Sequence, residues 1–171
     1  MLVAAIRGNG AYSCITYDNN KHIIYDAIMG FEDGYDGIHA ETYKDTTNNR
    51  MEIKGLIAAL ELATNKYKEE ECTIYCDSAY CVNMFNSWIS NWASNNWIGS
   101  SKEQVKNLDL VKQLYKYKLI DFPNFQVTKI NGHEGEIGNE LADAYATAKV
   151  YGNSTKLVKI ITENDITLEI G

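Results

Sequence analysis

The chain has 171 residues, of which 45% are hydrophobic and 23% are charged, an ordinary composition for one globular domain with a substantial core. Its formal net charge of −7 argues against a basic surface that grips nucleic acid non-specifically, although acidic residues can gather around bound metal ions. No apolar run approaches the roughly 20 residues that span a membrane, and no signal peptide is evident. The four cysteines lack zinc-site spacing. We therefore expect an intracellular, cytoplasmic protein with reduced thiols and no membrane partner.

The first third of the chain is typical of strands. Leu2 to Ile6 is a short apolar run that ends at a glycine-rich turn. Tyr12 to Tyr17 and His22 to Met29 are rich in β-branched and aromatic residues, and a polar turn separates them, which predicts a hairpin. A loop containing two Asp-Gly pairs follows, in the stretch GFEDGYDGIHAETYKD.

The hydrophobic period then changes to that of a helix. Apolar residues recur at helical spacing from Ile53 to Leu60, and Asn49 followed by Glu52 predicts the helix start. Cys72 to Cys76 is a continuous apolar stretch, as in a buried strand. It ends at Asp77-Ser78, which can cap a helix from Ala79 to about Ile89.

After residue 105, predicted helices again alternate with a strand. The apolar spacing from Val105 to Tyr115 predicts a helix, and Phe125 to Ile130 is predicted to be a strand. Asn139 is expected to cap a last helix that runs through Ala148. Tyr151–Gly171 alternates like a strand but has no obvious partner. The element order predicts an α/β layer in which a hairpin meander comes first and crossovers follow.

Four residues could carry chemistry. Asp77 directly follows a buried strand, where functional crevices of α/β sheets lie, and Glu52 and Asp143 lie in first helical turns. Taken singly, the carboxylates are explained by the preference of acidic residues for helix N-termini, and His133 by a solvated loop. Taken together, converging carboxylates repel each other unless divalent cations neutralise them, and hard oxygen ligands suit Mg²⁺ or Mn²⁺. Two such ions would support phosphodiester hydrolysis, with the imidazole handling a proton.

Several segments together resemble the ribonuclease H family, type 1, of the bacterial kind. They are TTNNRMEIKGLIAALELA, IYCDSAYCVNMFNSWISNW, NNW, VKNLDLVKQL and INGHEGEIGNELADAYA, which occur in the family's order and near its spacings. The resemblance covers residues 1–150 and leaves 151–171 as a C-terminal extension of unknown role. It implies a ribonuclease H-like fold, with a mixed five-stranded sheet, antiparallel meander first and then parallel strands, flanked by helices.

The resemblance also implies an activity: metal-dependent endonucleolytic hydrolysis of the RNA strand of an RNA/DNA hybrid. It places metal-binding carboxylates at Glu52, Asp77 and Asp143, and a catalytic histidine at His133. The implied cofactor is two Mg²⁺ ions, with Mn²⁺ as a substitute, and we expect a monomer. Recognition of a hybrid requires minor-groove contacts and shape, not base readout. The implied substrate-binding residues are Asn9, Asn48, Asn49, Ser78, Trp88, Trp92 and Lys106. Short amides such as Asn48 and Asn49 suit this role because they both donate and accept hydrogen bonds, and they can also cap a helix.

The Trp-rich stretch SWISNWASNNW departs from the family pattern. It corresponds to a helical protrusion that bacterial relatives use as a basic handle, but the lysines and arginines between the tryptophans are absent. Trp88 and Trp92 share a helix face, and we expect at least two of the three tryptophans to pack, with support of the DNA strand's sugar as the alternative. Lys102 and Lys106 are the nearest cations, so we expect weak substrate binding and low processivity.

The first strand departs further. In the family it ends in an Asp-Gly pair whose Asp bridges both metal ions, and alignment puts the missing Asp among Val3, Ala4 and Ala5. Three explanations for the missing Asp are open. It was replaced by Ala deliberately, the N-terminus is truncated or rebuilt, or the chain is a natural degenerate member of the family. We rank an altered start first. The competing function is a non-catalytic hybrid-binding or scaffold module. An integrase or resolvase is a distant third.

Overall fold

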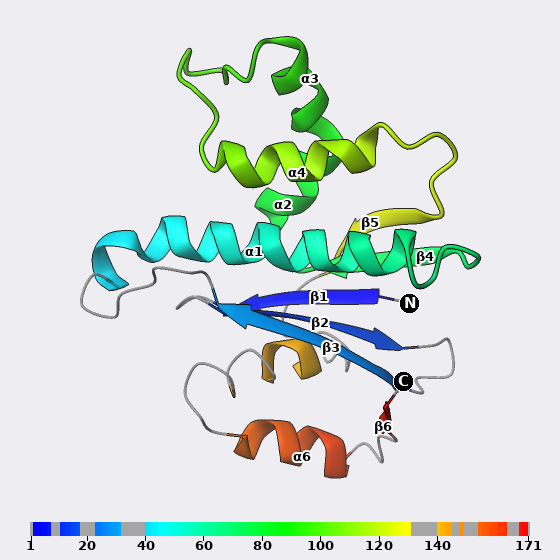
Figure 1. Cartoon of the computed structure of the whole chain (residues 1–171). Helices are drawn as coiled ribbons and strands as arrows, with labels where there is room; N and C mark the ends of the chain where they lie inside the picture. Colours follow the sequence, from blue (N-terminus) through cyan, green and yellow to red (C-terminus); the bar gives the residue numbers. More distant parts are fainter. Residues whose placement is uncertain are drawn as a thin grey trace.

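The computed structural model describes residues 2–7, 11–17, 23–31, 40–130, 140–144, 148, 154–163 and 168–170 (Figure 1). The elements in chain order are β1 (Leu2–Arg7), β2 (Ala11–Tyr17), β3 (Ile23–Phe31), α1 (Ala40–Thr64), β4 (Cys72–Cys76), α2 (Ala79–Asn83), η2 (Met84–Trp88), α3 (Ile89–Ser94), α4 (Leu108–Lys118), β5 (Phe125–Lys129), α6 (Thr155–Glu163) and β6 (Leu168–Ile170).

One mixed sheet organises these elements, in the strand order β5-β4-β1-β2-β3-β6. β1, β2 and β3 form the expected antiparallel meander, and β4 and β5 continue the sheet in parallel from β1. The α/β class and the meander are therefore confirmed. The prediction of five strands is wrong, because β6 adds a sixth that pairs in parallel with β3. A strand at the open edge of β3 satisfies backbone groups that the hairpin leaves exposed.

The tail also differs from its predicted strand pattern. Thr155–Glu163 forms the helix α6, and only Leu168–Ile170 is extended. Leu157 and Ile160 are three residues apart, so they lie on one helix face, and Ile160 is buried. A short apolar stretch of this kind is compatible with the spacing of a strand or of a helix. Packing of one apolar face stabilises the helix here.

Helices lie on both faces of the sheet. Figure 1 shows α1 along one face with α4, α2 and α3 stacked beyond it, whereas α6 and the helical residues 140–144 lie on the other face. α1 supplies much of the core between these layers. The largest side chains that are fully buried in the described residues are Met51, Ile53, Leu56, Leu60, Ile74, Met84, Ile89, Leu114 and Leu141.

α1 begins earlier than the sequence predicts. The helix start expected at Asn49 is wrong, because the backbone is helical from Ala40. Residues 40–45 read AETYKD and contain no Gly or Pro, so nothing in them stops the helix from extending toward its N-terminus. Asn48, Asn49 and Glu52 therefore lie in the helix interior and not in its first turn.

The helix after β4 begins as predicted. Ser78 is the N-cap of α2, and its side chain accepts a hydrogen bond from the backbone N–H of Cys81. The helical run then passes through a π-helical turn at Met84–Trp88 and continues as α3 to Ser94. The predicted helix from Val105 starts three residues later, at Leu108, and the predicted strand from Phe125 is β5. The predicted loop and cap at residues 131–139 lie outside the described residues. No helix in the described ranges is long and apolar enough to cross a membrane.

Candidate active site at the carboxyl end of β4

Glu52, Asp77 and Ser78 come together where β4 ends. Asp77 directly follows Cys76, the last residue of the strand, and Ser78 begins α2. The Ser78 hydroxyl donates to Oε2 of Glu52 at 2.8 Å and accepts from the Cys81 N–H at 3.2 Å. Ser78 is itself buried, so this small network fixes the Glu52 carboxylate from α1 against the start of α2.

The electrostatics at this point favour a bound cation. Burial raises the pKa of Glu52, the hydrogen bond from Ser78 lowers it, and the negative charge of Asp77 raises it further. The net direction is upward, so the ionised form of Glu52 is disfavoured in the free protein. A positive charge beside Glu52 and Asp77 would relieve both the burial cost and the repulsion.

Two thiols lie next to this carboxylate pair. Cys76 and Cys81 are fully buried and free. A hydrogen bond with Cys76, followed by burial, raises the pKa of the Cys81 thiol well above its usual value. Since the thiolate is the nucleophile and the metal ligand, a neutral Cys81 is suited to packing and not to either of those roles.

The strand register relates β1 to the carboxylate that follows β4. β1 pairs with β4 in parallel, with Val3 opposite Tyr75 and Ala4 opposite Cys76. Continuing that register by one residue brings Ala5 level with Asp77. Of Val3, Ala4 and Ala5, the three positions that the sequence left open for the first-strand Asp, Ala5 is therefore nearest to the level of Asp77.

Asp143 has a different neighbour. Lys156 of α6 donates from Nζ to Oδ2 of Asp143 at 2.9 Å. Within the described residues, no group of three or more His, Cys, Asp or Glu side chains lies close enough to hold a metal ion. Carboxylate oxygens are the donors that Mg²⁺ and Mn²⁺ prefer, but Glu52, Asp77 and Asp143 do not form a complete centre in this arrangement. As they stand, the described residues do not form a site that fits two ions.

The structure describes the other predicted site residues unevenly. His133 and Asn9 lie outside the described residues, and for Asn48 only the helical backbone is described. Asn49 is half-buried in α1, and Lys106 is exposed just before α4.

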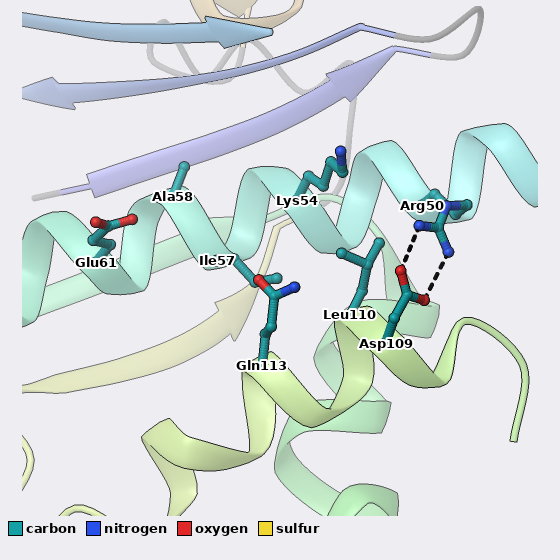
Figure 2. A pocket seen from close by; sticks show the side chains of 8 residues that line it. All are labelled: Arg50, Lys54, Ile57, Ala58, Glu61, Asp109, Leu110 and Gln113. Carbon is teal, nitrogen blue, oxygen red and sulfur yellow. Dashed lines mark hydrogen bonds and ion pairs between the residues drawn. The ribbon is translucent and has the colours of Figure 1, made fainter. Parts of the chain in front are cut away.

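The sequence reasoning missed an ion pair between Arg50 and Asp109, which Figure 2 shows joining α1 to α4. Arg50 binds Asp109 through two hydrogen bonds, Nη1 to Oδ1 at 3.0 Å and Nη2 to Oδ2 at 2.7 Å. The Arg50–Asp109 pair lines a hollow of about 390 Å³ between the two helices. Its partners are 59 residues apart in the chain, so no local pattern could have revealed the pair.

Arg50 also reaches the N-cap of α4. Its Nη1 lies 3.5 Å from the side-chain oxygen of Asn107, a long contact, and Asn107 has a left-handed backbone at φ 58°. Asn107 in turn hydrogen-bonds Tyr80 of α2. Burial raises the pKa of Tyr80, and the charge of nearby Glu52 adds to that rise, which keeps the phenol neutral. Arg50, Asn107 and Tyr80 therefore connect α4 and α2 to the surroundings of Glu52.

An aromatic row leads away from Tyr80. The ring centroids of Tyr80 and Trp88 lie 6.3 Å apart, and those of Trp88 and Trp92 lie 6.0 Å apart. Trp92 and Trp97 pack against the core, in line with the packing role expected for two of the tryptophans, whereas 40% of Trp88 is exposed. Trp88 and Trp92, with Asn91, Asn95 and residues 98–100, line a hollow of about 540 Å³.

Comparison with known proteins gives a consistent result. The model of the RNase H family matches residues 8–151. A ribonuclease H of Francisella tularensis subsp. novicida is 40% identical over 119 residues, which cover 68% of this chain and 75% of that protein.

Two solved structures are similar in fold. One is a foamy viral protease-reverse transcriptase in complex with RNA/DNA hybrid, with a TM-score of 0.68 and 16% identity over 89% of this chain. This chain spans only 20% of that viral protein. The other is LC9-RNase H1, described as a type 1 RNase H with the type 2 active-site motif, with a TM-score of 0.61 and 18% identity over 98% of this chain and 86% of that one.

Proposed function

Because the chain belongs to the ribonuclease H family, we propose that it hydrolyses the RNA strand of RNA/DNA hybrids as a type 1 enzyme. The observation that carries this proposal is the half-buried pair of Glu52 and Asp77 at the end of β4, within the stretch that matches the family. The site residues would be Glu52, Asp77, His133 and Asp143. Residues 1–150 would form the catalytic domain, acting as a monomer.

The role of the described residues follows from their contacts. Ser78 holds one oxygen of Glu52, so the other oxygen is left to face a cation or a water molecule. Asp77 adds a second carboxylate beside it. We propose Mg²⁺ as the cofactor, with Mn²⁺ as a substitute, because a divalent cation would neutralise this pair.

The aromatic row supports a surface for the hybrid. It runs from the neighbourhood of Glu52 through Tyr80 and Trp88 to the hollow lined by Trp92, and this hollow carries the amides of Asn91 and Asn95. Rings can pack on a sugar or a base whatever the sequence, and amides can bond phosphates or sugars. We propose that the DNA strand of the hybrid packs against Trp88, with Lys106, Asn9, Asn48 and Asn49 as further contacts.

The test is cleavage of an end-labelled RNA/DNA hybrid with Mg²⁺ or Mn²⁺, by the chain itself and by Ala5→Asp. A carboxylate level with Asp77 completes the set that the family pattern requires, so we expect Ala5→Asp to cleave at least about tenfold faster. Ala5→Asn is the matched control, because it has the same shape without the charge. Chelation with EDTA should abolish all cleavage. Cleavage of single-stranded RNA at the same rate would contradict hybrid specificity.

The alanine at position 5 favours a second candidate, a non-catalytic hybrid-binding module. This module would bind hybrid, and neither the chain nor Ala5→Asp would cleave it. A filter-binding measurement alongside the cleavage assay separates the two functions.

A further inference from the structure

Lys112 of α4 lies beside the Trp-rich region, although it belongs to a different helix. Its Nζ is 5.9 Å from the centroid of the Trp97 ring. That ring packs edge-on against Tyr115, three residues after Lys112 on α4, with the ring centroids 5.4 Å apart. Trp97 directly precedes Ile98, which lines the hollow of about 540 Å³ that also carries Trp88. The packing of α4 therefore brings a cation to the edge of this hollow.

The backbone brings two further lysines to the same region. The carbonyl of Trp97 accepts a hydrogen bond from the Val105 N–H at 2.9 Å, and Lys106 is the next residue. The N–H of Lys102 donates to the carbonyl of Gly99 at 3.0 Å, and Gly99 lines the hollow. Figure 1 shows the segment that carries these residues running from α3 back to the start of α4. Together with the lysine of α4, they form a basic cluster: Lys102, Lys106 and Lys112.

Little negative charge opposes this basic cluster. All three lysines are exposed, and no carboxylate among the described residues forms an ion pair with any of them. Glu103 and Asp109 are the two acidic residues between Trp88 and Lys112, and Arg50 already binds Asp109 through two hydrogen bonds. In a chain with a net charge of −7, the cluster is a local positive surface.

The contact with Trp97 prepares Lys112 to bind an anion. The face of the ring attracts the ammonium but offers it no hydrogen-bond acceptor, so its N–H groups remain available to an oxygen atom. The contact also limits the freedom of the lysine side chain, which lowers the entropy that binding costs. Rings and amides line the adjacent hollow. Cations beside exposed rings are the combination that holds a nucleic-acid backbone, and this favours phosphate over the carboxylates of a protein partner.

We propose that Lys112 binds a backbone phosphate of the hybrid, and that the basic cluster takes the place of the cations that the Trp-rich stretch lacks. The proposal rests on the proposed function, because it takes the hybrid as the ligand. A phosphate contact carries no base information, so Lys112 adds affinity and fixes register without selecting a sequence. Three lysines correspond to a slope of no more than about 3 when log affinity is plotted against log salt, which is a gentle dependence.

The test is filter binding of end-labelled RNA/DNA hybrid in EDTA at several salt concentrations, with the full chain and with Lys112→Gln. We expect Lys112→Gln to bind more weakly at low salt, with a slope shallower by about 1. One phosphate contact requires its affinity deficit to shrink about threefold between about 50 and 200 mM salt. Two hybrids of different sequence should be affected equally.

Two further variants separate the charge of Lys112 from its packing. Lys112→Arg keeps the charge and the ring contact, and it should keep the slope of the unaltered chain. Lys66→Gln is the matched control, because Lys66 is exposed just past the end of α1 and its Nζ lies 5.6 Å from the centroid of the Tyr67 ring. It removes the same charge and the same kind of contact elsewhere, and should leave the slope unchanged.

The proposal is overturned by equal slopes for Lys112→Gln and the unaltered chain, by an equal loss of slope in Lys66→Gln, or by no binding of hybrid. A deficit of Lys112→Gln that stays constant with salt would also overturn it and assign Lys112 to packing against Trp97. Cleavage with added metal is a separate readout. Cleavage with equal slopes would keep the proposed function and exclude the phosphate contact, whereas the expected change of slope without cleavage would do the reverse.

Discussion

At the residue scale, Ser78 shows how a local cap becomes part of the candidate site. Its side chain caps α2 by accepting a hydrogen bond from the Cys81 N–H. Its hydroxyl also donates a hydrogen bond to Glu52, 26 residues away in the chain. One buried hydroxyl thus satisfies a helix end and orients a carboxylate. The capping role is readable from the residue type and its position after a strand. The contact with Glu52 is not, because it depends on how α1 packs beside β4.

Replacement of Glu52 should separate stability from activity. The pKa of Glu52 is raised in the folded chain, so the stability that the neutral form contributes is present below its ordinary pKa and is lost as pH rises through the raised pKa. Without metal, Glu52→Gln should be more stable than the unaltered chain at pH 7 by about 0.5–2 kcal/mol, and equal to it at pH 4. Its hydrolysis of hybrid should fall by on the order of 100-fold or more.

Urea unfolding at the two pH values, followed by circular dichroism, checks this prediction. Glu61→Gln is the matched control, because Glu61 is exposed on the same helix. A Glu52→Gln chain that is less stable than the unaltered one at both pH values would contradict the role given to burial and to Asp77.

The Arg50–Asp109 pair predicts a loss of stability in acid. The hydrogen bonds from Arg50, together with its charge, lower the pKa of Asp109 to about 2, although partial burial acts to raise it. A lowered pKa contributes stability that is present above the ordinary value near 4 and is lost as pH falls through about 2. Asp109 is 61% exposed, so solvent screening limits the coupling to about 0.5–1 kcal/mol.

A double-mutant cycle with Arg50→Gln and Asp109→Asn measures this coupling at pH 7 and pH 2. It should be present at pH 7 and largely absent at pH 2. Arg50→Lys should recover little of it, because a lysine cannot reproduce the two parallel hydrogen bonds. A coupling of equal size at both pH values would mean that the carboxylate charge is not responsible.

At the scale of elements, α1 shows the limits of a capping signal. Asn49 with Glu52 three residues later has the form of a helix start, yet the helix begins at Ala40. A cap is a preference worth about 1 kcal/mol, and a preceding stretch of helix-compatible residues outweighs it. The consequence for function is that Asn49, Arg50 and Glu52 are presented from a continuous helix, which is more rigid than a helix end.

The other end of α1 depends on a residue from a distant loop. Asn124, just before β5, donates from Nδ2 to the carbonyls of Ala63 at 2.7 Å, Tyr67 at 3.1 Å and Glu70 at 3.0 Å. We expect Asn124→Ala to destabilise the chain by about 1–2 kcal/mol, because these carbonyls lose their donor. Asn124→Asp should destabilise the chain more than Asn124→Ala, because it places a negative charge against the three carbonyl oxygens.

Thermal or urea unfolding of the two variants checks this expectation. Gln126→Ala provides the control on the exposed side of β5 and should change stability by less than about 0.5 kcal/mol. If Asn124→Asp were as stable as the unaltered chain, the amide could not be acting as the cap of α1.

At the scale of the whole molecule, the net charge of −7 opposes binding to a polyanion. In the Trp-rich region, the hollow is lined by the rings of Trp88 and Trp92 and the amides of Asn91 and Asn95, where a basic handle would have lysines and arginines. We therefore expect the affinity for hybrid to fall only gently with salt. Ser94→Lys, on the exposed surface of α3, should tighten binding at low salt and steepen the plot of log affinity against log salt by about 1.

Filter binding at several salt concentrations measures this slope. Asn65→Lys, exposed just past the end of α1, adds the same charge elsewhere and should leave the slope nearly unchanged. Equal slopes for both variants would exclude α3 from the surface that contacts phosphates.

The sequence alone determined the features that depend on neighbours along the chain. The apolar stretch before Asp77 predicts a buried strand, Ser78 predicts the cap, and the four-residue spacing of Trp88 and Trp92 predicts that their rings meet. Family membership also follows from linear motifs. These inferences hold because strand, cap and helix spacing are local properties of the backbone.

Only the tertiary structure decided which distant groups are in contact. The register of β1 on β4 places Ala4 opposite Cys76, the residue before Asp77, and the packing of α1 beside β4 places Glu52 against Ser78. The pairing of β6 with β3 accompanies the contact of Lys156 with Asp143. Each depends on strands or helices from separate parts of the chain packing side by side. No local preference encodes such a register, because many pairings satisfy the same backbone hydrogen bonds and burial of the whole core selects among them.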